Sequence, residues 1–393
     1  MKSRRLRKIA LILLLTLLVF AIGFRVYVGY LAARNDTACL PDGQAQSSAS
    51  ELAIAAQLQA TLEAYSQTHG NVGLQASVIL PDGAQWQGAA GYANDAQACP
   101  LTLAHHLYVG SVTKTFTAAL VMEQVEAGTL RLDDTVGEWI AHLDGGGITI
   151  EMLLRHTSGL PNYTEDMPFL LAYFGLPEKQ WLPEELLAIT EDQPLKFEPG
   201  SRHEYSNTNF LVLGIILEKA TGKSYGELLG DAAGQMGLER IYYPAYSKSL
   251  IFANGYDETI FNLGKRNLTA FRTSLESGGY SAGGIAASAP DAAGFFHALF
   301  RAQWLADETI AQMMTTIDAP DEDVPLQAGY GLGTRNLIIG GEALFGHTGT
   351  IPGYSAVALH NPQHGFTIVV LSNVSTIEQT TLFADLQQVV LGP

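Results

Sequence analysis

Three short groups of residues in this chain could together activate a nucleophile. The first is Ser111-Val112-Thr113-Lys114, in which a hydroxyl and an amine stand three residues apart. On a helix this spacing places both side chains on one face, about 5–6 Å apart. Lysine removes the serine proton when burial or a neighbouring cation lowers its pKa. The pair alone is also typical of an ordinary helix N-terminus, so its partners decide the interpretation.

The second group is Tyr205-Ser206-Asn207, in a loop that precedes a predicted helix. A loop-borne tyrosine can shuttle a proton when a nearby cation lowers its pKa. Asn207 can donate to a substrate carbonyl and accept from Lys114. Taken alone, Tyr205 also fits a core aromatic residue and Asn207 a helix N-cap.

The third group is His347-Thr348-Gly349, followed by Thr350, at the end of a predicted strand. Gly349 would let a substrate approach the strand backbone closely, and Thr348 offers a hydroxyl to a carboxylate or carbonyl. The backbone N–H groups of Ser111 and Thr350 could form an oxyanion hole. His347 alone would also fit a surface histidine at a strand end.

The elements that must position these groups alternate along the chain. Period-two patterns predict strands near both ends, whereas helical patterns dominate between them. We therefore predict an α/β (α+β) fold, with a five-stranded antiparallel sheet from residues 50–105 and 325–393 and an inserted, mainly helical part over 111–320. A site at their junction would be a cleft. The predicted strands are 72–80, 84–93, 330–334, 337–339, 343–346, 354–360 and 366–371.

In this order and on these elements, the three groups resemble those of the penicillin-recognising serine hydrolases: class C β-lactamases, D-Ala-D-Ala carboxypeptidases and related esterases. The resemblance covers roughly residues 50–390 and implies a β-lactamase/transpeptidase-like fold. Four further stretches carry it, namely Leu153-Leu154-Arg155-His156-Thr157-Ser158-Gly159-Leu160-Pro161, Glu198-Pro199-Gly200, Leu213-Gly214-Ile215-Ile216-Leu217-Glu218 and Ser281-Ala282-Gly283-Gly284.

The resemblance also implies a role for each residue. Ser111 would attack a carbonyl and form an acyl-enzyme, while Lys114 and Tyr205 would handle the proton. Asn207 would hold Lys114 and the substrate amide, and residues 347–350 would bind the acyl chain edge-on as an added strand. No cofactor and no metal are expected. His105-His106 lack metal-ligand spacing and are interpreted as surface or structural residues.

The departure from the family pattern is His347, where many relatives carry lysine. It replaces a fixed cation with one that titrates near neutrality, and it is closest to the His-Thr-Gly type of carboxypeptidase and to D-amino-acid peptidases and esterases. A substrate carboxylate would need a permanent cation. Arg335, on the preceding strand, is the candidate, although it also fits an exposed strand arginine.

The expected function is a D-Ala-D-Ala carboxypeptidase-type or β-lactam-reactive serine hydrolase of the cell envelope. The alternatives are an esterase or β-lactamase of the same fold, or a sensor of β-lactams or muropeptides that turns over slowly. The expected partner is a small peptide, ester or β-lactam, and we favour a monomer. Six basic residues in 1–33 leave 16 bases against 39 acids, a net charge of −23, in the remainder. This balance excludes nucleic acid as a partner.

Residues 1–33 are interpreted as a membrane anchor or signal segment, because basic residues precede an apolar run over 9–24. We favour a single-pass anchor through residues 9–33, with the catalytic domain outside the cytoplasm, over a cleaved signal that would release a secreted protein. Residues 34–49 are a linker and 50–393 the hydrolase domain. Cys39 and Cys99 fall in the exported part, where we favour a disulfide over two free thiols.

Overall fold

The computed structural model describes residues 52–392 apart from 144–146, 245–249, 260–263, 302, 322–323 and 325, together with eight positions nearer the N-terminus, among them Cys39. Most of the predicted membrane anchor lies outside the described residues. Within the described part of the chain, no helix is both long enough and apolar enough to cross a membrane.

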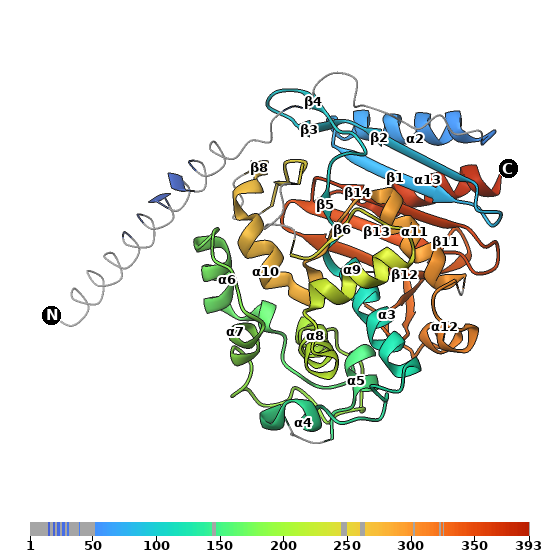
Figure 1. Cartoon of the computed structure of the whole chain (residues 1–393). Helices are drawn as coiled ribbons and strands as arrows, with labels where there is room; N and C mark the ends of the chain where they lie inside the picture. Colours follow the sequence, from blue (N-terminus) through green and yellow to red (C-terminus); the bar gives the residue numbers. More distant parts are fainter. Residues whose placement is uncertain are drawn as a thin grey trace.

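A seven-stranded antiparallel sheet forms the centre of the fold, in the order β10-β11-β12-β13-β14-β1-β2 (Figure 1). Because β1 pairs with both β2 and β14, the two ends of the chain meet in one sheet, as predicted. The prediction of five strands is wrong, since two short strands extend the sheet beyond β12. The strands are β1 (Leu74–Ile79), β2 (Gln85–Ala90), β10 (Gln327–Tyr330), β11 (Arg335–Ile339), β12 (Glu342–Ile351), β13 (Tyr354–His360) and β14 (Thr367–Ser372).

Both faces of this sheet are covered, which explains why its central strands are mostly apolar. Every residue of β13 and β14 is buried. Successive side chains point to opposite faces, so alternate residues enter two separate cores. Helices α2 (Ala55–Thr68) and α13 (Gln379–Leu391) pack on one face, and α11 (Ala289–Phe300) packs on the other.

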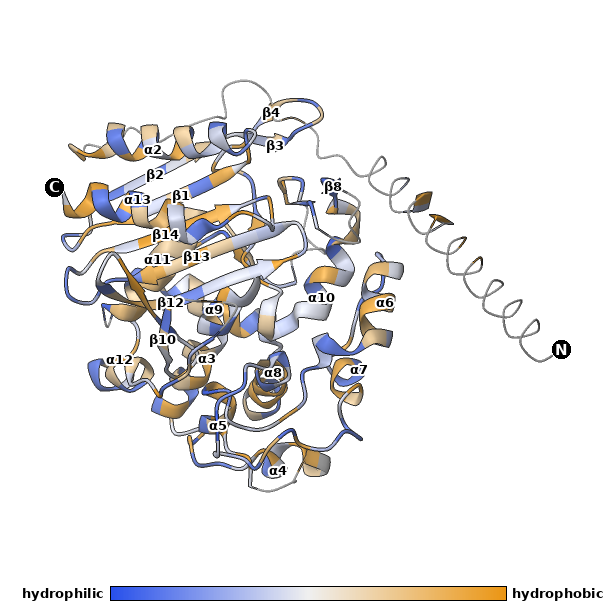
Figure 2. Cartoon of the chain, turned by 180° about the vertical axis from the view of Figure 1, so that it is seen from behind, coloured by the Kyte–Doolittle hydropathy of each residue, from blue (hydrophilic) through white to orange (hydrophobic). Residues whose placement is uncertain are grey.

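The segment between the two halves of the sheet is mainly helical. Helix α8 is buried from Thr208 to Leu217 and contacts α3, α5 and α10. Figure 2 shows that many residues of α8 are hydrophobic. The helices are α3 (Thr113–Glu126), α4 (Val136–Trp139), α5 (Ile150–Leu154), α6 (Met167–Gly175), α7 (Pro183–Ala188), α8 (Asn207–Thr221), α9 (Tyr225–Gln235), α10 (Arg272–Gly283) and α12 (Asp307–Met314).

Short strands form three smaller sheets around this region: β3 with β4, β5 with β9 and β6, and β7 with β8. The disulfide predicted between Cys39 and Cys99 is present, and it joins residues 60 positions apart at β4. These strands are β3 (Tyr92–Asn94), β4 (Cys99–Pro100), β5 (Leu107–Tyr108), β6 (Ile241–Tyr242), β7 (Tyr256–Asp257), β8 (Arg266–Asn267) and β9 (Ala286–Ala287).

Three predicted elements near the site are corrected by the structure. Residues 331–334 form a turn rather than a strand, because Gly333 adopts φ +69° and Gly331 N–H donates to the Thr334 carbonyl. The Gly-rich composition of 277–284 predicts a loop, but this segment largely belongs to α10, which is kinked at Tyr280. Strand β12 continues to Ile351, so His347 lies inside a strand and not at its end.

Candidate active site

Ser111 lies in a 3-10 turn, Gly110–Val112, at the start of α3. Strand β12 runs directly against this turn. A Cβ atom on Gly349 would lie 2.1 Å from the Val109 carbonyl oxygen, and one on Gly110 would lie 2.8 Å from Thr350 N. Only glycine at these two positions allows so close an approach. The third group of residues is thereby packed against the first.

Lys114 is fully buried beneath Ser111. Its Nζ lies 3.1 Å from Ser111 Oγ, 2.7 Å from Asn207 Oδ1 and 2.8 Å from the Ala282 carbonyl oxygen. Burial, and then the positive charge of Arg335, hold the Lys114 pKa well below that of an ordinary lysine. Both effects favour the neutral amine, the form that can accept a proton from Ser111.

Asn207 is the first residue of α8, and its amide orientation is set by its neighbours. Its Nδ2 donates to Thr164 Oγ1 over 2.9 Å, and its backbone N–H donates to Asn162 Oδ1 over 3.1 Å. The carbonyl oxygen is therefore the end that faces Lys114. Ser206, not Asn207, occupies the N-cap position of α8.

Tyr205 lies over Lys114, with Nζ 4.8 Å from the centre of its ring. Its hydroxyl oxygen is buried and makes no hydrogen bond of standard geometry within the described chain. Burial raises the Tyr205 pKa, whereas the Arg335 guanidinium and the Ser111 hydroxyl oppose that rise. The structure thus brings Ser111, Lys114, Tyr205 and Asn207 together.

The structure gives Arg335 a different place from the predicted one. The residue is 5% exposed, its Nη1 contacts Asp321 Oδ2 at 2.9 Å, and it also donates to Gln327 Oε1. Its guanidinium carbon is 5.0 Å from the centre of the Tyr205 ring. Arg335 is neither an exposed strand arginine nor free to receive a substrate carboxylate, because it is buried and forms an ion pair with Asp321.

His347 is fully buried as well, which corrects the expectation of a cation that titrates near neutrality. Its Nε2 lies 3.0 Å from the Tyr330 hydroxyl, and its Nδ1 contacts the Thr348 carbonyl. Burial, followed by the charges of Arg335 and Lys114, holds the His347 pKa well below its usual value. The imidazole is therefore neutral at physiological pH.

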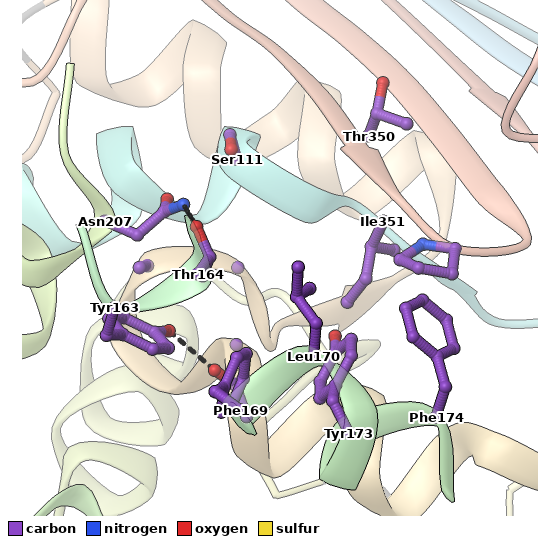
Figure 3. A pocket seen from close by; sticks show the side chains of 15 residues that line it. Ser111, Tyr163, Thr164, Phe169, Leu170, Tyr173, Phe174, Asn207, Thr350 and Ile351 are labelled. Carbon is purple, nitrogen blue, oxygen red and sulfur yellow. Dashed lines mark hydrogen bonds between the residues drawn. The ribbon is translucent and has the colours of Figure 1, made fainter. Parts of the chain in front are cut away.

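Ser111 opens into a cavity of about 250 Å³ (Figure 3). Ser111, Asn207 and Thr350 lie at its polar end. No charged side chain of the described chain lines the cavity. Its apolar wall is formed by Tyr163, Phe169, Leu170, Tyr173, Phe174, Ile351 and Pro352.

Most of this wall comes from α6, which was absent from the predicted site. The apolar run Met167–Gly175 was the available signal, but an apolar helix does not reveal which face meets a cavity. Helix α6 reaches the site because Gly278 leaves room for the Tyr173 ring, which would lie 2.5 Å from a Cβ atom there.

The other histidines singled out in the sequence are structural. His105 and His106 are buried, and both hydrogen-bond to the main chain, so the surface interpretation was wrong. Among the described residues, no group of three or more His, Cys, Asp or Glu side chains could hold a metal ion.

Comparison with known proteins agrees with this geometry. A model of the Beta-lactamase family matches residues 58–388. The chain belongs to the Beta-lactamase family. The order of its three groups predicted this membership.

Curated relatives include a penicillin-binding protein of Bacillus subtilis (strain 168), 27% identical over 72% of this chain and 64% of its own length. A D-aminopeptidase of Brucella anthropi is 25% identical over 80% of this chain and 59% of its own. The chain thus spans about 60% of the length of these relatives. A D-stereospecific amidohydrolase from Streptomyces sp. matches with a TM-score of 0.73 and 27% identity, over 84% of this chain and 98% of that protein.

Proposed function

We propose that this protein hydrolyses small amides, peptides or esters that carry a bulky apolar group and no free carboxylate, through an acyl-enzyme on Ser111. The observation that carries the proposal is the position of Ser111 Oγ. It stands between a buried, desolvated Lys114 amine 3.1 Å away and the apolar cavity.

In the proposed reaction, neutral Lys114 accepts the proton of Ser111 as Oγ attacks the substrate carbonyl. The backbone N–H groups of Ser111 and Thr350 stabilise the oxyanion. Lys114 and Tyr205 then deliver the proton to the departing nitrogen or oxygen as its bond to the acyl carbon breaks. Water attacks the resulting ester, releases the acid and restores the Ser111 hydroxyl.

The cavity favours this substrate class over a D-Ala-D-Ala peptide. A free carboxylate in the cavity would need a cation, and the buried Arg335 is already paired with Asp321. An aromatic or branched side chain would instead be buried against Phe169, Leu170 and Phe174. The names of the D-aminopeptidase and D-stereospecific amidohydrolase relatives support a D-configured substrate.

Mass spectrometry of the intact protein after exposure to D-phenylalanine amide, a D-Ala-D-Ala peptide, an aryl ester and penicillin tests the proposal. We expect an acyl adduct on Ser111 and turnover of the first and third compounds. Ser111→Ala should lose both, with activity reduced by at least about 10⁴-fold. Retained hydrolysis in Ser111→Ala would rule out the mechanism. Preferred turnover of the D-Ala-D-Ala peptide would support a carboxypeptidase instead. A stable penicillin adduct without turnover of any substrate would support a sensor.

We also propose that the domain works outside the cytoplasm, attached through residues 9–33. The Cys39–Cys99 disulfide supports an oxidising compartment. Protease treatment of intact cells should remove the domain from the cell surface or periplasm; a domain that is protected until the cytoplasm is opened would contradict this.

A further inference from the structure

His156 is a buried histidine in the stretch 153–161 and has no place in the proposed reaction. It adopts φ +55°, a left-handed conformation that non-glycine residues seldom take. Its side chain is fully buried. Such a strained backbone conformation persists only where surrounding contacts stabilise it, and it is common near functional sites.

The two residues that flank Tyr205 are both bonded to His156. The backbone N–H of Glu204 donates to the His156 carbonyl over 2.9 Å, and that of Ser206 donates to His156 Nδ1 over 3.2 Å. The Tyr205 ring packs on the imidazole, with 4.3 Å between ring centres. His156 therefore binds the loop through one hydrogen bond on each side of Tyr205, and its imidazole packs against the Tyr205 ring.

The other ring nitrogen of His156 leads to the third group of site residues. His156 Nε2 lies 3.2 Å from the Tyr330 hydroxyl, which lies 3.0 Å from His347 Nε2. His347 Nδ1 in turn contacts the Thr348 carbonyl. One chain of hydrogen bonds thus connects the Tyr205 loop to strand β12.

The two ends of this chain fix its direction. Ser206 N–H can only donate, so His156 Nδ1 accepts and the His156 proton lies on Nε2. The Thr348 carbonyl can only accept, so the His347 proton lies on Nδ1 and Nε2 accepts. Because burial keeps both imidazoles neutral, these two ends require Tyr330 to receive from His156 and to donate to His347.

The charges around the chain agree with neutral rings. Burial and then Lys114, His203, His347 and Arg335 hold the His156 pKa well below its usual value. The Tyr330 pKa is raised well above its usual value, mainly by burial. The hydrogen bonds from His156 through Tyr330 to His347 therefore need not transfer a proton. Their role is to hold the three side chains in fixed orientations.

We propose that His156 and Tyr330 are positioning residues, which hold the Tyr205 loop and the His347 strand in register on the two sides of Ser111. The inference rests on the proposed role of Tyr205 and of β12 in acyl transfer. It gives a function to the stretch 153–161 and to the left-handed backbone conformation of His156 within it.

NMR of protein labelled with ¹⁵N in its histidine rings tests the chain without relying on activity. At pH 7 we expect the His156 proton on Nε2 and the His347 proton on Nδ1, with the two sets of signals assigned from His156→Asn and Tyr330→Phe. The opposite tautomers, or a charged ring at either position, would overturn the proposal. A failure of Ser111→Ala to abolish acylation would reject the proposed function and leave this result standing.

Kinetics test the consequence of the chain. Tyr330→Phe keeps the ring and removes the bridge, and we expect kcat to fall about 10-fold with KM changed less than about twofold, because the binding cavity is untouched. Tyr65→Phe on α2, which removes a hydroxyl bond to the Glu378 carbonyl at the start of α13, is the matched control and should not change kcat. A folded Tyr330→Phe with unchanged kcat would overturn the proposal.

A pair of substitutions at His156 separates positioning from loss of packing. Asparagine tolerates the left-handed conformation and keeps an acceptor near the place of Nδ1, whereas alanine does neither. We expect His156→Ala to lose about 100-fold in kcat and His156→Asn to recover about 10-fold of that loss. Equal losses in the two variants would contradict a role in holding the loop.

Discussion

The two sides of Ser111 differ in charge and in packing. On one side lie the buried residues Lys114, Arg335 and His347, and the half-buried Tyr205, whose ring packs against all three. On the other side is an open cavity with an apolar wall. The Arg335 cation on the first side is buried and paired with Asp321, and no charged side chain of the described residues lines the cavity on the second. Acyl-transfer chemistry and substrate recognition are thus separated in space, so substitutions on the two sides should change different kinetic constants.

The largest expected effect comes from removing the fixed charge of the polar side. Arg335 lowers the Lys114 pKa, so Arg335→Gln should raise it. Lys114 acts as a base only when neutral, and the acid limb of kcat/KM should therefore move to higher pH. At pH 7 we expect a loss of about 10- to 100-fold.

Arg335→Lys, which keeps a positive charge, should leave the acid limb near its original pH. The double variant Arg335→Gln/Asp321→Asn removes the partner charge as well and separates the electrostatic effect from the instability of an unpaired Asp321. If Arg335→Gln folds and the acid limb of its kcat/KM profile does not move, the Arg335 charge does not control the Lys114 pKa.

The apolar side offers a matched pair of leucines on α6. Leu170 lines the cavity, whereas Leu171 is 55% exposed on the outer surface, where Figure 2 shows α6 to be hydrophobic. Leu170→Ala should lower kcat/KM for D-phenylalanine amide about 10-fold and change D-alanine amide little, because only the larger group reaches the wall. Leu171→Ala should match the wild type for both substrates. Similar losses for the two substrates would remove α6 from recognition.

The smallest expected effect is on stability in acid. Burial lowers the pKa of His203, beside Tyr330 on the polar side, to about 4. An unfolded histidine binds its proton near pH 6.5, so protonation favours the unfolded chain and the free energy of unfolding falls as pH drops from about 6.5 to 4. After allowance for solvent screening, His203 should contribute about 1 kcal/mol per pH unit to that fall.

Urea unfolding at pH 7, 6 and 5 measures this slope. His203→Gln should reduce this slope by about 1 kcal/mol per pH unit, leaving the share of the other buried histidines, whereas Leu170→Ala on the apolar side should lower stability by a similar amount at every pH. An unchanged slope in His203→Gln would mean that the histidine takes up its proton without unfolding.

The order of the three groups was sufficient to predict the fold class and the cluster of Ser111, Lys114, Tyr205 and Asn207. Each of these residue types has few uses at such spacing, and the chain had to bring its two ends together to form the sheet. The Cys39–Cys99 disulfide also followed from the compartment that the N-terminus indicates.

The charge state of His347 and the ion pairing of Arg335 could not be predicted from the sequence. His347 and Arg335 were expected to be a titrating and an accessible cation. Burial reversed both expectations, because desolvation depends on residues that lie elsewhere in the sequence, such as Lys114 for His347 and Asp321 for Arg335. The wall of α6 was missed for the same reason. The sequence shows which residues are apolar, but the tertiary structure decides which of them leave a space unfilled.

The pairing of β1 with β14 has a consequence for how the enzyme comes into being. Leu74 faces Ser372 across the sheet, so residues close to opposite ends of the chain must meet before the sheet closes. During synthesis, the Ser111 turn is made long before β12, against which it packs. A nascent or C-terminally truncated chain thus has its nucleophile but not the strand beside it. Such a chain leaves β1 as an unpaired edge open to other chains. Acylating activity should accordingly arise only once the whole chain has been completed, and faulty early products should aggregate rather than react.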